Sequence, residues 1–140
     1  MKNKYIDLIE QTFEFPQEGF SVNDNELSFY DVPLMDIIKQ YGTPLKITYL
    51  PKISSQINRA KRMFNVAMAK VDYEGDYHYC YCTKSSHFSF VLEEAMKNDI
   101  HLETSSAYDI HIINALYDSR IIDKDRYIIC NGYKRPQYIE

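Results

Sequence analysis

The nine residues that decide the fold are Tyr79-Cys80-Tyr81-Cys82-Thr83-Lys84-Ser85-Ser86-His87. Aromatic and β-branched residues favour strands, and the alternating pattern places Lys84 on the same face as the small residues Cys80 and Cys82. Ser85 and Ser86 offer a hydroxyl N-cap for the amphipathic segment that follows. The stretch therefore predicts a buried strand, a tight turn and a helix. Lys84 then lies at the carboxyl end of the strand, where ligands bind in parallel α/β proteins.

Strands and helices alternate along the rest of the chain. Further strands are expected to begin near Leu45, Ile100 and Tyr127, where short apolar runs start. Helices are expected between them, because apolar residues recur at spacings of three and four. Their apolar faces comprise Leu34, Ile37, Ile38 and Tyr41; Ile53, Ile57, Ala60, Phe64 and Ala67; Phe88, Val91, Leu92, Ala95 and Met96; and Ile110, Ile113 and Tyr117. This alternation predicts parallel βαβ units with right-handed crossovers.

Local signals mark where several of these elements begin and end. Pro33 is expected in the first turn of the first helix, with Gly42 just beyond its end. Ser106-Ala107-Tyr108-Asp109 fits a capping box that opens a later helix. The run Tyr127-Ile128-Ile129-Cys130 is continuously apolar, which is typical of a strand buried on both faces.

The composition indicates an ordinary globular protein. The 140 residues carry a formal net charge of -4 and a pI near 5.6, which offers no basic stripe for nucleic acid. Arg59, Lys61 and Arg62 are interpreted as a solvated helix face. Since neither a signal peptide nor a membrane span is evident, we expect a cytoplasmic protein that binds no membrane.

The cysteine pattern gives no disulfide framework. Three cysteines without a CxxC pair favour a reducing compartment. His78, Cys80 and Cys82 would put three soft ligands on one strand face, but a closed zinc site needs a fourth ligand. We therefore expect no metal there and interpret the cysteines as small barrel-interior residues.

The predicted organisation is an arm followed by part of a barrel. Residues 1–30 mix aromatic and acidic residues without a sustained period and are expected to form an arm with short extended pieces. A flavodoxin-like or Rossmann sheet also fits the alternation, but neither GxGxxG nor a P-loop is present. A complete (β/α)₈ TIM-like barrel takes roughly 250 residues, so residues 31–140 are predicted to be the first portion of a truncated one.

Four segments resemble the pyridoxal-phosphate decarboxylases with an alanine-racemase-like barrel. Tyr81-Cys82-Thr83-Lys84 is similar to the Tyr-x-x-Lys segment of that family, and Tyr41-Gly42-Thr43-Pro44-Leu45 is similar to a segment shared by its diaminopimelate, ornithine and arginine decarboxylases. Tyr73-Glu74-Gly75-Asp76-Tyr77 and Ile129-Cys130-Asn131-Gly132-Tyr133-Lys134 resemble the biosynthetic arginine decarboxylase branch more closely. The resemblance runs from about Leu27 to the end of the chain.

The sequence departs from the family pattern in two places. Ser86 stands where the family has asparagine, and His101-Leu102-Glu103-Thr104-Ser105-Ser106-Ala107 replaces Gly-Leu-Glu-Ala-Gly-Ser-Lys. These changes leave cofactor attachment in place but bear on the exact substrate. They also fit a non-catalytic homologue that keeps the fold.

The resemblance implies that Lys84 carries pyridoxal phosphate as a Schiff base and handles a proton after carbon dioxide leaves. The lysine must present a neutral amine, which burial beside Cys80 and Cys82 would favour. Glu103 is a second candidate for cofactor binding, with an interaction at the start of the following helix as its alternative role. His87 is interpreted as a residue of a helix N-terminus rather than an acid or base.

By the same resemblance the substrate is a basic amino acid, and arginine, ornithine and diaminopimelate are all candidates. The leading prediction is the decarboxylation of arginine to agmatine in polyamine biosynthesis. Mg²⁺ is a further candidate cofactor, and a homo-oligomer is expected at full length. The family's phosphate-binding and substrate-reading residues come later in the chain, so these residues alone are expected to be inactive. A Schiff-base aldolase is the rival enzyme class, but by resemblance its lysine strand would come late in the barrel.

Overall fold

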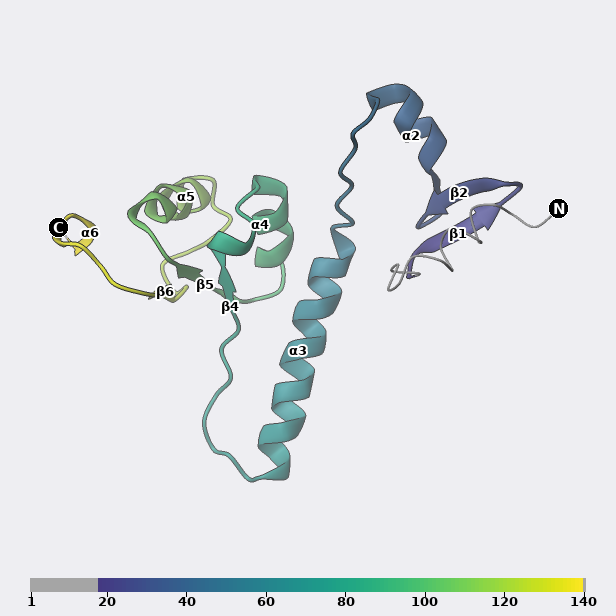
Figure 1. Ribbon diagram of the computed structural model, residues 1–140. Helices are drawn as coiled ribbons and strands as arrows, with labels where there is room; N and C mark the ends of the chain where they lie inside the picture. The colour runs from purple at the N-terminus through teal and green to yellow at the C-terminus, as the bar shows by residue number, and fades with distance from the viewer. Residues whose placement is uncertain (1–17, 140) are drawn as a thin grey trace. The chain divides into compact units, whose positions relative to one another are not determined.

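A computed structural model of the chain describes residues 18–139. The chain is of the mixed α/β class and divides into two compact units, Met1–Ile47 and Thr48–Glu140, both visible in Figure 1. The predicted boundary between arm and barrel, at residues 30 and 31, lies inside the first unit. Residues 1–17 of the predicted arm lie outside the described residues.

The described part of the first unit is a small antiparallel sheet followed by a helix. Strands β1 (Phe20–Asn23), β2 (Glu26–Phe29) and β3 (Val32–Pro33) pair in the order β1-β2-β3. Asp24 and Asn25 both have positive φ angles, of 49° and 64°, as a two-residue type I′ hairpin requires. The short extended pieces expected before residue 30 therefore pair with one another.

Helix α2 spans Leu34–Tyr41, as the sequence predicts. Gly42 follows it with φ 77°, and its N–H donates to Ile38 O at 2.8 Å. Pro33 is the N-cap residue and pairs in β3, so its expected place in the first helical turn is wrong. The strand expected over residues 45–50 is also wrong, because within residues 18–139 no strand pairs with this segment and a strand is stable only when paired.

The second unit alternates helices and parallel strands. The helices are α3 (Pro51–Lys70), α4 (Ser89–Met96), α5 (Ala107–Asp118) and α6 (Pro136–Ile139), and the strands are β4 (Cys80–Cys82), β5 (His101–Thr104) and β6 (Ile128–Cys130). The strands form one parallel sheet in the order β4-β5-β6. This confirms the predicted parallel α/β pattern for three of the four expected strands.

The core of the second unit lies between α3, α4, α5 and one face of this sheet (Figure 1). Leu92, Ile100 and Leu102 are among its fully buried side chains, and Ile57 joins them from α3. On α5 the core-facing residues are Ile112, Ile113 and Leu116 rather than Tyr117, which is 44% exposed. On α3 the predicted apolar face is only partly used, because Phe64 is 51% exposed and stacks on Tyr77.

Two strand predictions need correction. The central strand stretch is shorter than expected, because after Cys82 the chain turns into a 3₁₀ helix, Thr83–Ser85, and α4 has Phe88 rather than Ser85 or Ser86 as its N-cap residue. Strand β6 is not buried on both faces, since Ile129 is 45% exposed. Within the described residues β6 is an edge strand with β5 as its one neighbour, which explains the exposure.

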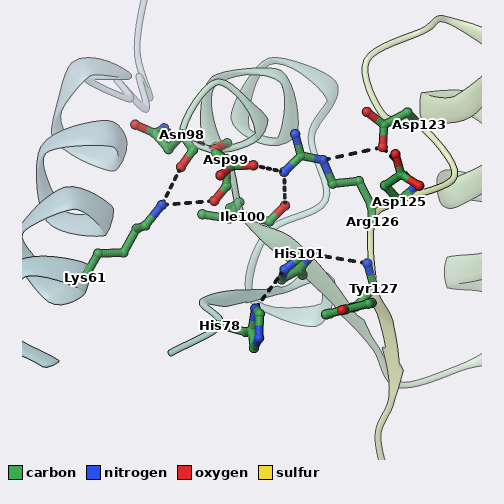
Figure 2. A network of polar contacts seen from close by, with 11 residues as sticks. Lys61, His78, Asn98, Asp99, Ile100, His101, Asp123, Asp125, Arg126 and Tyr127 are labelled. Atoms are coloured by element: carbon green, nitrogen blue, oxygen red, sulfur yellow. Dashed lines mark hydrogen bonds and ion pairs between the residues drawn. The ribbon is translucent and has the colours of Figure 1, made fainter. Parts of the chain in front are cut away.

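A polar network joins the amino ends of the three strands (Figure 2). Lys61 Nζ donates to the carbonyl oxygens of Asn98 and Asp99, each at 3.0 Å, so Lys61 is not the solvated residue that its sequence predicts. Arg126 pairs with Asp99 and donates to Ile100 O at 3.2 Å. The network thus ties α3 and the segment before β6 to the turn that precedes β5.

Two histidines extend the network across the sheet. The Tyr127 N–H donates to His101 Nδ1 at 3.1 Å, and His101 Nε2 lies 3.2 Å from His78 Nδ1. Because Nδ1 accepts a hydrogen bond, the proton of neutral His101 lies on Nε2 and points to His78. Burial is the main cause that lowers the pKa of His101, and the charges of His78, Arg126 and Lys61 lower it further. The charge of Asp99 opposes this shift.

Acid should therefore weaken the fold through His101. Folded His101 binds protons less readily than the unfolded chain, so its stabilising effect is present above the unfolded pKa of about 6.5 and is lost as the pH falls below it. Urea unfolding at pH 8 and pH 5.5 should show this loss in the unchanged chain and a smaller loss in His101→Gln. The exposed His111 provides the control, because His111→Gln should leave the pH dependence unchanged.

Shortening a core side chain of the central strand β5 should lower the free energy of unfolding strongly. Leu102 is 0% exposed, so Leu102→Ala should lower the free energy of unfolding by about 2–5 kcal/mol through lost burial and the cavity left behind. Val66→Ala, at a side chain that is 50% exposed on α3, should change it by less than about 0.5 kcal/mol. Equal effects of the two substitutions in urea unfolding would contradict the core described here.

Candidate functional site

The candidate site lies at the carboxyl edge of the β4-β5-β6 sheet. Parallel strands end at the same edge, so the residues that end or follow them are brought together. Lys84 follows β4, Glu103 is the third residue of β5, and Asn131 follows β6 directly. Glu103 pairs in register with Cys82, which places their side chains on the same face of the sheet.

Lys84 is exposed, and the prediction that it is buried beside Cys80 and Cys82 is wrong. The chain leaves the strand at Thr83, whose side chain takes the buried position and is 0% exposed. The Thr83 hydroxyl donates to Glu103 O at 3.1 Å, which holds the 3₁₀ turn against β5. The Lys84 amine is thus presented to solvent at the edge of the sheet, where a ligand can reach it.

Glu103 is held as a carboxylate at this edge. Asn131 Nδ2 donates to Glu103 Oε1 at 2.8 Å. This hydrogen bond is the main cause of the lowered pKa of Glu103, with smaller contributions from the Cys82 thiol and the charge of Lys84, and partial burial opposes them. The structure therefore places the two predicted site residues, Lys84 and Glu103, at the same edge of the sheet, where the charge of Lys84 contributes to the lowered pKa of Glu103.

The alternative role of Glu103, at the start of the following helix, is filled by another residue. Asp109 Oδ2 accepts from the N–H groups of Ser105 at 2.7 Å and Ser106 at 2.9 Å, which confirms the predicted capping box of α5. Burial opposes ionisation of Asp109, but these hydrogen bonds outweigh it and lower its pKa. The first turn of α5 thus has its own carboxylate, and Glu103 is left to the edge of the sheet.

Three residues of the edge were not predicted as site residues. Asn131 and Lys134 lie in the segment that resembles the arginine decarboxylase branch, and Thr83 lies in the Tyr-x-x-Lys segment, but the resemblance assigned no role to any of the three. Lys134 Nζ donates to Ser105 O at 3.2 Å and also to Asn131 O, so it joins the loops that follow β5 and β6. The hydrogen bonds that join Thr83 to Glu103, Asn131 to Glu103 and Lys134 to Ser105 connect residues 20, 28 and 29 positions apart in the chain. No local pattern reveals such contacts.

A cleft of about 550 Å³ opens between the start of α5 and the segment that leads into α6. Lys134 and Arg135 supply its cations, and Tyr108, Tyr133 and Tyr138 supply aromatic rings. Lys134 lies over the ring of Tyr138, with Nζ 4.4 Å from the ring centroid. This size is within the range of small-molecule pockets, and the cleft adjoins the edge that carries Glu103 and Asn131.

Of the remaining predicted residues, His87 takes no part in this arrangement, whereas the charge of Glu103 acts on Cys80. His87 is exposed between the 3₁₀ turn and α4, so it is not a residue of the helix N-terminus as expected. Within residues 18–139, no three His, Cys, Asp or Glu side chains lie close enough together to hold a metal ion. The Cys80 thiol donates to His78 O at 3.8 Å, and burial, followed by the charge of Glu103, raises its pKa.

The fold and the site together define an α/β chain with a lysine and a glutamate at the carboxyl edge of a parallel sheet. This chain is similar to biosynthetic arginine decarboxylases, which confirms the resemblance found in its sequence. The relative from Shewanella sediminis is 27% identical over 128 residues, covering 86% of this chain and 18% of the relative. The relative from Parasynechococcus marenigrum is 29% identical over 106 residues, covering 73% of this chain and 16% of the relative.

A third biosynthetic arginine decarboxylase, from Bacteroides thetaiotaomicron, is 26% identical over 128 residues, covering 89% of this chain and 19% of the relative. The chain thus spans less than a fifth of the length of these relatives. No protein-family model matches the chain, and no solved structure matches it. Within the described residues, the helices are too short or too polar to cross a membrane.

The buried Thr83 hydroxyl should be needed for the geometry of the edge. Thr83→Val keeps the shape but leaves Glu103 O without its donor, which should lower the free energy of unfolding by about 1–3 kcal/mol. Thr83→Ser keeps the hydroxyl and should cost less in the same urea unfolding experiment. The reverse order would show that the Thr83 methyl group, rather than its hydrogen bond, stabilises the turn.

Proposed function

We propose that the protein is a pyridoxal-phosphate-dependent decarboxylase of a basic amino acid, and that its reaction is the conversion of L-arginine to agmatine and carbon dioxide for polyamine biosynthesis. The observation that carries the proposal is that the exposed Lys84 amine and the ionised Glu103 carboxylate lie at the same carboxyl edge of the sheet. The names of the three similar proteins support arginine as the substrate.

The residues present fit the attachment of an aldehyde cofactor. A lysine that condenses with an aldehyde must be reachable from solvent, and Lys84 is exposed on a turn that Thr83 fixes to β5. Glu103 supplies a negative charge beside it, and Glu103 is fixed by Asn131. In this proposal Lys84 holds the cofactor covalently, and Glu103 orients it by charge.

Each residue of the edge has a definite part in the reaction. When bound, pyridoxal phosphate supplies an electron sink for the electron pair that carbon dioxide leaves behind. In the proposed reaction, Lys84 Nζ would hold the cofactor and would carry the proton that is returned to the α-carbon of the substrate. The ionised Glu103 would attract the cationic amino groups of Lys84 and of a bound basic amino acid. The hydroxyl of Thr83 holds the turn that carries Lys84 against β5.

The wider architecture belongs to the same proposal. The sheet β4-β5-β6 would be part of a (β/α)₈ barrel, with Cys80, Cys82 and Glu103 on its inner face. We propose further that the full-length protein is a cytoplasmic homo-oligomer, with Mg²⁺ as a candidate second cofactor. Ornithine and diaminopimelate remain the alternative substrates, because the segment Tyr41-Gly42-Thr43-Pro44-Leu45 resembles one that all three decarboxylases share.

A non-catalytic homologue that binds the cofactor is the second candidate. Ser86 replaces the asparagine of the family pattern, and Tyr81 OH donates to the Ser86 backbone oxygen at 3.0 Å, so the turn after Lys84 has a contact of its own. Such a protein would keep Lys84 and its attachment chemistry but would not turn over a basic amino acid.

Borohydride reduction tests the proposal directly. The full-length protein, incubated with pyridoxal phosphate and reduced, should carry one stable label on the peptide that contains Lys84, and it should release carbon dioxide from arginine. Lys84→Ala should lose both the label at this site and essentially all turnover, whereas Lys97→Ala, an exposed lysine just after α4, should keep both.

The outcomes separate the candidates. A label on Lys84 without turnover of arginine, ornithine or diaminopimelate would favour the non-catalytic homologue. Turnover of ornithine or diaminopimelate in place of arginine would correct the substrate, and the absence of label on Lys84 would exclude the proposed cofactor site.

A further inference from the structure

We infer that Asn131 is a positioning residue, whose side-chain amide fixes the Glu103 carboxylate at the carboxyl edge within reach of the charge of Lys84. The inference rests on the proposed function and assigns one more residue to its site. Its basis is the hydrogen bond from Asn131 Nδ2 to Glu103 Oε1 at 2.8 Å, which joins the carboxyl ends of β5 and β6.

Asn131 is itself held firmly enough to fix another side chain. Its N–H donates to Thr104 O at 2.9 Å, which continues the pairing of β5 and β6 by one residue. Its carbonyl oxygen accepts from Lys134 Nζ, and Lys134 also donates to Ser105 O at 3.2 Å. The Asn131 N–H is therefore bound to β5, and its carbonyl oxygen is connected through Lys134 to the loop after β5. These two contacts fix the backbone from which the side-chain amide extends.

Glu103 is held from the opposite side as well. The fully buried Thr83 donates to Glu103 O at 3.1 Å, and Thr83 immediately precedes Lys84. Glu103 thus lies between a contact from the β4 side to its backbone and a contact from the β6 side to its carboxylate. The backbone contact cannot orient the carboxylate, which is oriented by side chains. Asn131 on the β6 side makes the main contribution, and the Cys82 thiol and the charge of Lys84 on the β4 side add smaller ones, with Cys80 also facing Glu103 electrostatically.

A side-chain amide suits position 131 because it carries no charge and donates an N–H to the Glu103 carboxylate. A hydrogen bond to the charged form of a carboxyl group stabilises that form, and here it is the main cause of the lowered pKa of Glu103. An aspartate of the same size at position 131 would offer no N–H donor. It would also place two carboxylates at hydrogen-bonding distance, which favours protonation of one of them.

The consequence for the proposed reaction is a permanent negative charge at the edge of the sheet. Glu103 remains ionised through the neutral range and attracts cationic nitrogen atoms, whether Lys84 Nζ or the amino group of a basic amino acid. Without Asn131 the carboxylate would turn away or become protonated in weak acid, and the attraction would be lost as the pH falls.

The test compares Asn131→Asp and Asn131→Ala in the full-length protein, with Asn114→Asp as the matched control. Asn114 is an exposed residue of α5, so its substitution makes the same chemical change away from the site. Two quantities are measured from about pH 4, close to the ordinary pKa of a glutamate, to about pH 9: the yield of borohydride-fixed pyridoxal phosphate on Lys84, and kcat/KM for arginine. Circular dichroism of each variant establishes that it folds.

Asn131→Asp should move the acid limb of both profiles to higher pH by about one unit and lower kcat/KM about tenfold in weak acid, since one pKa unit corresponds to a factor of ten. Asn131→Ala should move them in the same direction by less, and Asn114→Asp should match the unchanged protein. In a Glu103→Gln background, Asn131→Asp should cause no further shift, because the group it acts through is absent.

A purely structural role gives a different result. If Asn131→Asp has the same effect with and without Glu103, or leaves both pH profiles unchanged while Lys84 is still labelled, the inference is overturned and the proposed function stands. If Lys84 of the unchanged protein takes no label at any pH, the proposed function fails first and the positioning role fails with it.

Discussion

The pairing of β5 with both of its neighbours is the constraint on which the second unit depends. Strand β5 lies between β4 and β6, and its side chains alternate between the two faces of the sheet. Leu102 and Thr104 are fully buried on the face that the helices cover, whereas Glu103 lies on the other face beside Cys82. One strand therefore fills the core and presents the site, so that the position of Glu103 follows from the packing of its neighbours.

The elements that sequence reasoning predicted well are those with local causes. The capping box of α5 depends on Ser106 and Asp109, three residues apart, and both contacts form as expected. Four residues of the predicted apolar face of α4 pack as their spacing predicts, since Val91, Leu92, Ala95 and Met96 are all buried, whereas Phe88 is the N-cap residue and is 55% exposed. In these cases the pattern and the structure depend on the same few neighbouring residues.

Two of the wrong predictions concern partners that are distant in the sequence. A strand over residues 45–50 fits the local pattern, but pairing decides whether a strand forms, and no pattern within the segment reveals its partner. The burial of Lys84 fails for a similar reason, because the chain turns at Thr83 to meet Glu103, which lies 20 residues further on. Of the candidate site, Lys84 and Glu103 could be predicted through the resemblance, whereas Asn131 and Lys134 become visible only when the loops after β5 and β6 are seen together.

The edge position of β6 has a consequence for handling the protein. Within residues 18–139 both outer strands of the parallel sheet leave one row of backbone N–H and C=O groups unpaired, and Ile129 adds an exposed apolar side chain to β6. Open strand edges of this kind are templates for pairing with other chains. A preparation that contains these residues alone should therefore self-associate as its concentration rises, with added β-structure in the aggregates, and its solubility should improve when a charged residue such as lysine replaces Ile129.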